Sequence, residues 1–99
     1  MGKREKDIET LVTRTISHFG GKAYKWQSPM NRGVPDRLCF LPKGLMIAIE
    51  VKAPGETPRK LQTKVIKGLR AMGHEVLTVS NKQEVDALYH RLKEFYNEQ

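Results

Sequence analysis

The first part of the chain repeats its apolar side chains at the spacing of an α-helix. Over residues 4–19, one stripe recurs every three or four positions and consists of Ile8, Leu11, Val12, Thr15, Ile16 and Phe19. This period predicts an amphipathic helix whose stripe faces a core. Gly20 and Gly21 follow the stripe and predict the end of the helix.

Three strand-like segments come next. Residues 22–27 alternate in polarity, 36–41 are mostly apolar, and 45–52 form the most apolar segment of the chain. A loop rich in Pro, Asn and Gly is predicted over 28–35. The sequence Pro42-Lys43-Gly44 predicts a turn, so the second and third strands would pair as an antiparallel hairpin.

A second helix is predicted after this hairpin. Thr57 would cap it, Pro58 would occupy its first position, and Gly73 would follow its end near Met72. Its apolar arc contains Leu61, Val65, Leu69 and Met72. On the same wheel Gln62 lies about 100° from Leu61, on the inner flank of the helix.

A fourth strand and a last helix complete the pattern. Residues 74–79 predict the strand, and Ser80 with Gln83 fits a capping box for a helix that runs to about Tyr96. One face of this helix carries Val85, Leu88, Tyr89, Leu92 and Tyr96. The order α-β-β-β-α-β-α predicts an α/β fold with a mixed central sheet flanked by helices, since the third and fourth strands would be joined by a right-handed crossover.

Length and charge limit the function. Residues 1–99 fit one domain, so any binding and any chemistry would share one surface. The 18 basic residues exceed the 11 acidic ones, which favours a polyanionic partner such as nucleic acid. No segment resembles a signal peptide or a membrane span, and Cys39 is the only cysteine, so we expect a cytoplasmic protein without a disulfide or thiolate metal site.

Two acids and a base are expected at one end of the sheet. Asp36 comes at the start of the second strand, and Glu50 and Lys52 come at the end of the third. In an antiparallel hairpin these ends lie side by side. Two close carboxylates repel each other unless a proton or a cation lies between them, and a hard divalent cation would resolve that conflict.

The first helix offers a further acid to this site. With Ile8 as the origin of the helical wheel, Glu5 lies about 60° away, inside the apolar arc, and Glu9 lies about 100° away, at its edge. Glu5 is the expected site acid, and Glu9 is the alternative on nearly the same face. The simpler interpretation is that Glu5 only complements the helix dipole.

These residues resemble a known nuclease pattern. Pro35-Asp36, thirteen intervening residues and Glu50-Val51-Lys52 match the PD-(D/E)xK signature. The longer stretches RGVPDR and IEVKAP, with Gln62 and Glu5 in the neighbouring helices, resemble the VRR-NUC family, of stand-alone, virus-type members in particular. The resemblance covers residues 5–80 and implies the restriction-endonuclease-like αβββαβ core, here followed by a C-terminal helix.

The resemblance implies a Mg²⁺- or Mn²⁺-dependent DNA endonuclease. Asp36, Glu50, the Val51 carbonyl and Glu5 would bind the metal, while Lys52 and Gln62 would act beside it. Arg32, Arg37 and Arg59 would contact phosphates, although solvated loop charges explain each of them equally well. A homodimer that cleaves branched DNA such as a four-way (Holliday) junction, in the host cytoplasm if the protein is viral, is implied by the stand-alone members.

Other functions remain open. A basic module that binds nucleic acid without cleaving it explains the charge but not the acids and the lysine at one strand end. A protein-interaction domain would use the apolar face of the last helix, and a nicking nuclease would lack any preference for junctions. Metal-dependent cleavage of DNA separates the nuclease from the binding modules.

Overall fold

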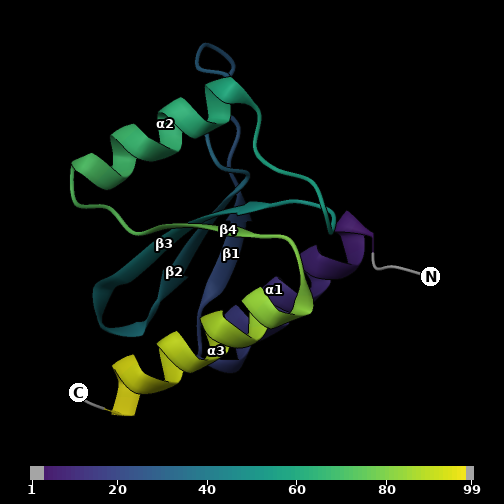
Figure 1. Ribbon diagram of the computed structural model, residues 1–99. Helices are drawn as coiled ribbons and strands as arrows, with labels where there is room; N and C mark the ends of the chain where they lie inside the picture. The colour runs from purple at the N-terminus through teal and green to yellow at the C-terminus, as the bar shows by residue number, and fades with distance from the viewer. Residues whose placement is uncertain (1–3, 98–99) are drawn as a thin grey trace.

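The computed structural model describes residues 4–97 as a four-stranded sheet between two layers of helices (Figure 1). The elements are α1 (Glu5–His18), β1 (Lys22–Lys25), β2 (Arg37–Leu41), β3 (Leu45–Val51), α2 (Lys60–Ala71), β4 (Val76–Val79) and α3 (Lys82–Asn97). A 3-10 turn, Pro42–Gly44, joins β2 to β3. The predicted α/β fold with a mixed sheet and a C-terminal helix is confirmed.

The sheet has the order β1-β2-β3-β4. The first three strands are antiparallel, and Leu41 lies opposite Leu45 next to the hairpin turn. β3 and β4 are parallel, with Ala48 opposite Val76, so α2 is the crossover between them. Both the predicted hairpin and the predicted crossover are therefore present.

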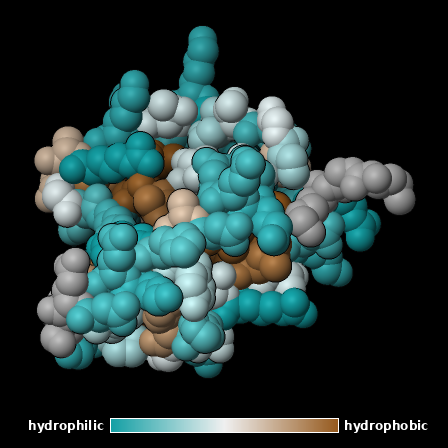
Figure 2. Space-filling view, turned by 60° about the horizontal axis from the view of Figure 1, so that its bottom comes forward, coloured by the Kyte–Doolittle hydropathy of each residue, from teal (hydrophilic) through white to brown (hydrophobic). Residues whose placement is uncertain are grey.

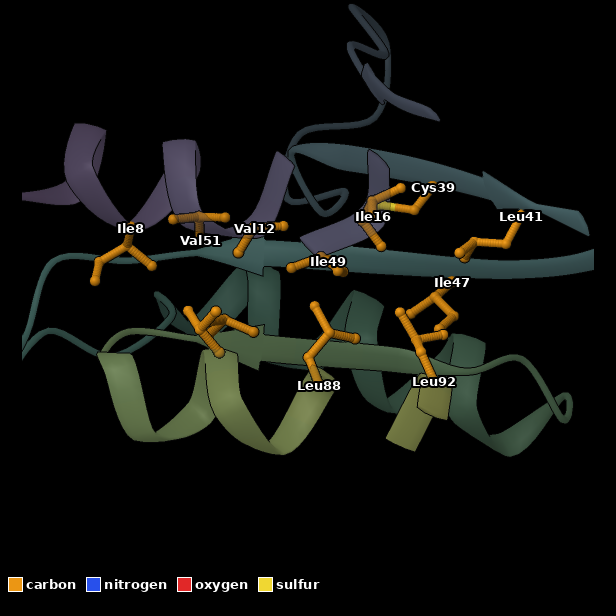
Figure 3. Close-up of a cluster of buried hydrophobic side chains, with 12 residues drawn as sticks. Ile8, Val12, Ile16, Cys39, Leu41, Ile47, Ile49, Val51, Leu88 and Leu92 are labelled. Atoms are coloured by element: carbon orange, nitrogen blue, oxygen red, sulfur yellow. The ribbon is translucent and has the colours of Figure 1, made fainter. Parts of the chain in front are cut away.

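The larger core lies between the sheet and the pair α1 and α3 (Figure 3). Its buried residues are Ile8, Val12, Ile16, Cys39, Leu41, Ile47, Ile49, Val51, Val79, Val85, Leu88 and Leu92. Figure 3 shows Ile8 beside Val51, so the start of α1 lies near the end of β3. The apolar face of α3 is used to cover its own sheet.

A smaller core lies on the other face, under α2. It contains Ala48, Ile66 and Val76, with Trp26, Leu38 and Leu69 packed against them. The apolar arc predicted for α2 is misplaced, because Leu61 is 50% exposed and Met72 is 69% exposed. The buried positions of α2 are Gln62 and Ile66 instead. A polar side chain therefore occupies the buried face of this helix.

The predicted start of α2 is wrong. The helix begins at Lys60, after the extended residue Arg59, and not at Pro58. The reason is a side chain in the first turn, because Gln62 Oε1 accepts the backbone N–H of Arg59 at 3.1 Å. This bond satisfies an amide that would otherwise lack a partner at the helix end.

The predicted cap of α3 is wrong by one residue. Asn81 Oδ1 accepts the backbone N–H of Glu84 at 2.8 Å. Glu84 in turn accepts the backbone N–H of Ser80 at 2.9 Å. The capping residues are therefore Asn81 and Glu84, because Glu84 carries the carboxylate that can bond back to the chain before the helix.

The surface is mostly polar. Figure 2 shows a largely hydrophilic face in which small hydrophobic areas lie between polar side chains. Within residues 4–97, every helix is too short or too polar to cross a membrane.

Candidate active site

The ends of β2 and β3 bring Asp36, Glu50 and Lys52 together. Asp36 directly precedes β2, and the pairing of Arg37 with Ile49 places it beside Glu50. Two hydrogen bonds fix this arrangement. The Asp36 backbone N–H donates to Glu50 Oε1 at 3.1 Å, and the Val51 N–H donates to Asp36 Oδ2 at 3.4 Å.

Glu50 is a buried carboxylate with a full set of partners. Its Oε2 lies 3.1 Å from Lys52 Nζ and accepts a hydrogen bond from Gln62 Nε2 at 2.8 Å. Burial of a carboxylate is costly unless it is paired and hydrogen-bonded, and both conditions are met here. The acid and the base at the end of β3 therefore form an ion pair, which Gln62 joins from α2.

Asp36 is compensated less well, because only its Oδ2 accepts a hydrogen bond, from the Val51 N–H. Its Oδ1 is buried and accepts no hydrogen bond from any described residue. The nearest cation is Arg37, whose Nη1 lies 3.9 Å away, which is beyond hydrogen-bonding distance. Burial first, and then the charge of Glu50, raise the pKa of Asp36 to about 7. A buried carboxylate oxygen without a hydrogen-bond partner can bind a proton or a metal cation.

The donors at this site fit a hard divalent cation in part. Asp36 and Glu50 supply carboxylate oxygens, and the backbone carbonyl of Val51 is the third donor expected from the sequence. Among residues 4–97, no group of three Asp, Glu, His or Cys side chains lies close enough to bind a metal alone. Mg²⁺ does not need three such side chains, since it usually keeps several water ligands and binds only one or two carboxylates.

Arg37 points into the protein rather than toward solvent. Its Nη2 lies 3.3 Å from Glu9 Oε2, and its Nη1 donates to the Asp36 carbonyl at 3.0 Å. The side chain is only 15% exposed. These contacts place Arg37 between α1 and the site, a position that was not expected from the sequence.

Of the two acids considered in α1, Glu9 is the one in contact with the site. Glu9 bonds to Arg37, and its charge also contributes to the raised pKa of Asp36. Glu5 lies one turn earlier, partly buried in the first turn of α1. Within residues 4–97, no hydrogen bond or ion pair joins the Glu5 side chain to Asp36, Glu50 or Lys52.

The two other arginines proposed for DNA lie beside the site. Arg32 in the loop before β2 and Arg59 before α2 are exposed, and both line a pocket of about 720 Å³. Gln62, which bonds to Glu50, lines the same pocket. These two guanidinium groups are thus free to meet a ligand that also approaches the carboxylates.

Comparison with known proteins agrees with this geometry. No protein-family model matches the chain. A relative named "Putative nuclease p44", from Acyrthosiphon pisum secondary endosymbiont phage 1, is 44% identical over 79 residues, which cover 80% of this chain and 85% of the relative. A solved structure described as "VRR_NUC domain" superposes with a TM-score of 0.82 at 25% identity, over 87% of this chain and 94% of that one.

The solved domain shares the arrangement of helices around the mixed sheet, and the phage relative shares nearly half of the aligned residues over most of its length. Each similarity covers at least four-fifths of the chain and therefore includes the central segment that contains Asp36 and Glu50. On these grounds the chain belongs to the VRR-NUC family of nucleases.

Proposed function

We propose that this nuclease is a metal-dependent DNA endonuclease whose reaction centre is the pair Asp36 and Glu50. The buried Asp36 Oδ1 without a hydrogen-bond partner carries the proposal, because it lies next to a second carboxylate where β2 begins and β3 ends. A binding module gains nothing from two acids facing phosphates. Mg²⁺ or Mn²⁺ would be held by Asp36, Glu50 and the Val51 carbonyl.

A divalent cation bound there supplies polarisation of the scissile phosphate and a lower pKa for the attacking water. Lys52 is the group of this chain that acts on the reacting atoms. Its ammonium, 3.1 Å from Glu50, would position the water or stabilise the charge that develops on the phosphate. Gln62 would keep Glu50 oriented, and Arg32 and Arg59, which line one pocket beside the site, would bind phosphates of the neighbouring nucleotides.

The acid from α1 would complete the site through Arg37. The ion pair with Arg37 supports Glu9 for this role in preference to Glu5. Arg37 would then hold Asp36 and Glu9 in place from within the protein. Because its side chain faces inward, phosphate contacts are proposed for Arg32 and Arg59 first.

The substrate preference follows from the size of the domain. One domain offers one centre and cuts one strand per encounter, so paired cuts need a second copy, and a symmetric dimer is the commonest arrangement. We propose a homodimer that cuts opposing strands of a four-way junction. The alternative is a nicking nuclease without junction preference.

The proposal is tested with purified protein and a labelled duplex. We expect cleavage with Mg²⁺ or Mn²⁺, none with EDTA, and binding without efficient cutting with Ca²⁺. Asp36→Ala, Glu50→Ala and Lys52→Ala should each reduce cleavage by at least about a hundredfold. Asp86→Ala and Lys93→Ala remove exposed charges from α3 and are the matched controls. Full cleavage in EDTA would contradict the metal mechanism.

A further inference from the structure

The pocket beside the candidate active site, called the hollow below, contains Arg32, Arg59 and Gln62, but its apolar residues have no role in the chemistry described so far. It lies between the loop before β2 and the first turn of α2, and in Figure 1 that loop projects beyond the start of α2. Its lining residues are Gln27, Ser28, Pro29, Asn31, Arg32, Gly33, Val34, Arg59, Leu61 and Gln62. Its volume of about 720 Å³ lies within the range of pockets that enclose small molecules.

The chemistry of the walls suits a nucleotide better than a bare phosphate. Arg32 and Arg59 supply positive charge, and no acidic residue is among the described residues that line the hollow. Pro29, Val34 and Leu61 supply an apolar wall, which offers nothing to a phosphate but can pack against the face of a base. Polar side chains at its rim can meet the edge of that base.

The hollow is held in shape by the fold. Asn31 donates its backbone N–H to the Ser28 carbonyl at 2.9 Å, which closes a turn in the loop. Gly33 has a φ of +97°, and a Cβ there would lie 2.9 Å from Leu61 Cγ and 3.0 Å from its carbonyl oxygen. The loop therefore approaches α2 at a distance that only glycine allows at this position. Such a preformed pocket does not have to be ordered when a ligand binds.

The position of the hollow links it to the reaction centre. Gln62 lines it and donates to Glu50 at 2.8 Å, so one side chain separates the hollow from the carboxylate pair. Beyond Leu61 the surface continues into a second hollow beside Lys64, and the tip of the loop there, Met30, is 91% exposed. A strand whose phosphate lay at Asp36 and Glu50 would pass its next nucleotides along this surface.

We propose that this hollow binds the base of one unpaired nucleotide next to the scissile phosphate. A base that stays paired and stacked in a duplex cannot enter a hollow of this kind, so the ligand must be unpaired or extruded. The proposal rests on the assignment of the carboxylate pair as a DNA-cleaving centre. It adds a structural requirement to the substrate, namely a nucleotide that is free to leave the helix, as at a branch point or a bulge.

The test measures binding without cleavage, in EDTA and at one salt concentration. Three labelled duplexes are compared by fluorescence anisotropy: a fully paired duplex, the same duplex with a one-nucleotide bulge, and that bulge with an abasic site. We expect the bulge that carries a base to bind several-fold more tightly than the abasic bulge, because only a base can pack against the apolar wall of the hollow. Equal affinity for the two bulges would overturn the proposal.

Two variants distinguish contacts with the base from contacts with the phosphate. Leu61→Ala should weaken binding of the base-bearing bulge several-fold and leave the abasic bulge unchanged, while Arg32→Ala should weaken both equally. Met72→Ala, an exposed apolar position at the far end of α2, and Lys93→Ala on α3 are the controls. If Leu61→Ala has no effect on the base-bearing bulge, the base does not bind in the hollow. Cleavage with Mg²⁺ is measured separately, so a failure of the pocket leaves the nuclease assignment intact.

Discussion

Asp36 holds its proton at a pH where an ordinary aspartic acid has lost it. Burial of its carboxyl and the neighbouring charge of Glu50 raise its pKa from the ordinary value of 3.8 to about 7. The nearby Arg37 lowers the pKa again but does not cancel the effect. Without metal, the residue is therefore a weak point of the fold near neutral pH. With metal, the same position becomes a ligand once it has lost its proton.

The first prediction concerns pH and metal. Between about pH 4 and pH 7, the metal-free folded state holds a proton on Asp36 that the unfolded state has lost, so stability falls as pH rises through this window. A bound divalent cation replaces that proton. Mg²⁺ or Mn²⁺ should therefore raise the thermal unfolding midpoint more at pH 8 than at pH 6.

The matched variant for this experiment is Asp36→Asn, which keeps the shape of the side chain and removes its titration. It should abolish most of the metal-dependent rise in the midpoint and flatten the fall in stability between about pH 4 and pH 7. A metal effect of the same size at both pH values, or one that Asp36→Asn retains, would contradict metal binding at Asp36.

The second prediction concerns the acid from α1. Glu9→Gln should reduce cleavage by more than Glu5→Gln, because Glu9 bonds to Arg37 and acts on the charge of Asp36. The helical wheel favours Glu5, so the two residues are compared directly, in steady-state cleavage at saturating Mg²⁺. Asp7→Asn, in the same first turns of α1, is the control. A larger loss from Glu5→Gln would restore the assignment made from the wheel.

At the scale of single residues, the sequence predicted which residues of the candidate site lie together better than it predicted their bonding partners. Asp36, Glu50 and Lys52 were found because strand pairing alone brings two strand ends together. The inward position of Arg37 differs from the prediction, although Arg37 lies on the same face of β2 as the buried residues Cys39 and Leu41. The contacts with Glu9 and with the Asp36 carbonyl explain why a mostly covered arginine is tolerated there.

At the scale of secondary-structure elements, the sequence pattern predicted every helix and strand of the described chain. The errors lie in the starts of α2 and α3, in the apolar arc of α2, and in the bounds of the strands, since β1 ends at Lys25 and β4 begins at Val76. Thr57 and Pro58 form a good helix start by local preference, yet α2 begins at Lys60. A tertiary contact determines where the helix begins, because Gln62 bonds both to the Arg59 amide and to Glu50. Helix propensity depends on the local sequence and cannot predict that contact.

The third prediction uses the double role of Gln62 in α2. Gln62→Ala should lower the free energy of unfolding by about 1–2 kcal/mol, since the Arg59 amide and Glu50 each lose a hydrogen bond. Gln62→Glu retains an acceptor for the Arg59 amide but places a third carboxylate beside Glu50. It should reduce cleavage by more than its effect on stability would suggest.

Urea denaturation with and without Mg²⁺ measures the stability of these variants, and initial cleavage rates measure their activity. Gln83→Ala, at an exposed position in the first turn of α3, is the control for loss of a glutamine near a helix start. If Gln62→Ala unfolds at the same urea concentration as the unmodified protein, Gln62 does not anchor α2.

At the scale of the whole molecule, the fold was predictable because each connection between strands allows few arrangements of the strands it joins. A turn of three residues forces the hairpin, and a helix between β3 and β4 forces a parallel pair. The hollow between residues 27–34 and α2 was not predictable, since it depends on how a loop packs through Gly33 onto Leu61. Packing of that kind leaves no period in the sequence.

The structure also changes which apolar surface is available for a dimer. The apolar face of α3, which the sequence offered as a surface for protein interaction, packs against its own sheet through Val85, Leu88 and Leu92. Large apolar side chains remain exposed elsewhere, on the part of the sheet around β1 and β2. Tyr24 and Phe40 are in edge-to-face contact with ring centroids 5.9 Å apart, and Phe40 pairs with the exposed Met46. These three side chains form an exposed apolar group on the sheet, separate from the exposed Leu61 and Met30 beside the hollow.

The fourth prediction is that two copies act together on branched DNA. Light scattering should give a mass of twice the protomer, and Phe40→Glu should give a monomer, because a charge in the apolar group opposes its burial. The unmodified protein should cut opposing strands of a four-way junction in preference to a linear duplex at matched salt, and dilution should reduce the rate per protomer on the junction. Phe40→Glu should retain single-strand nicking, because Asp36 and Glu50 are unaltered, while it loses the paired cuts. A monomer with equal activity on both DNAs would contradict junction resolution and leave the nuclease assignment in place.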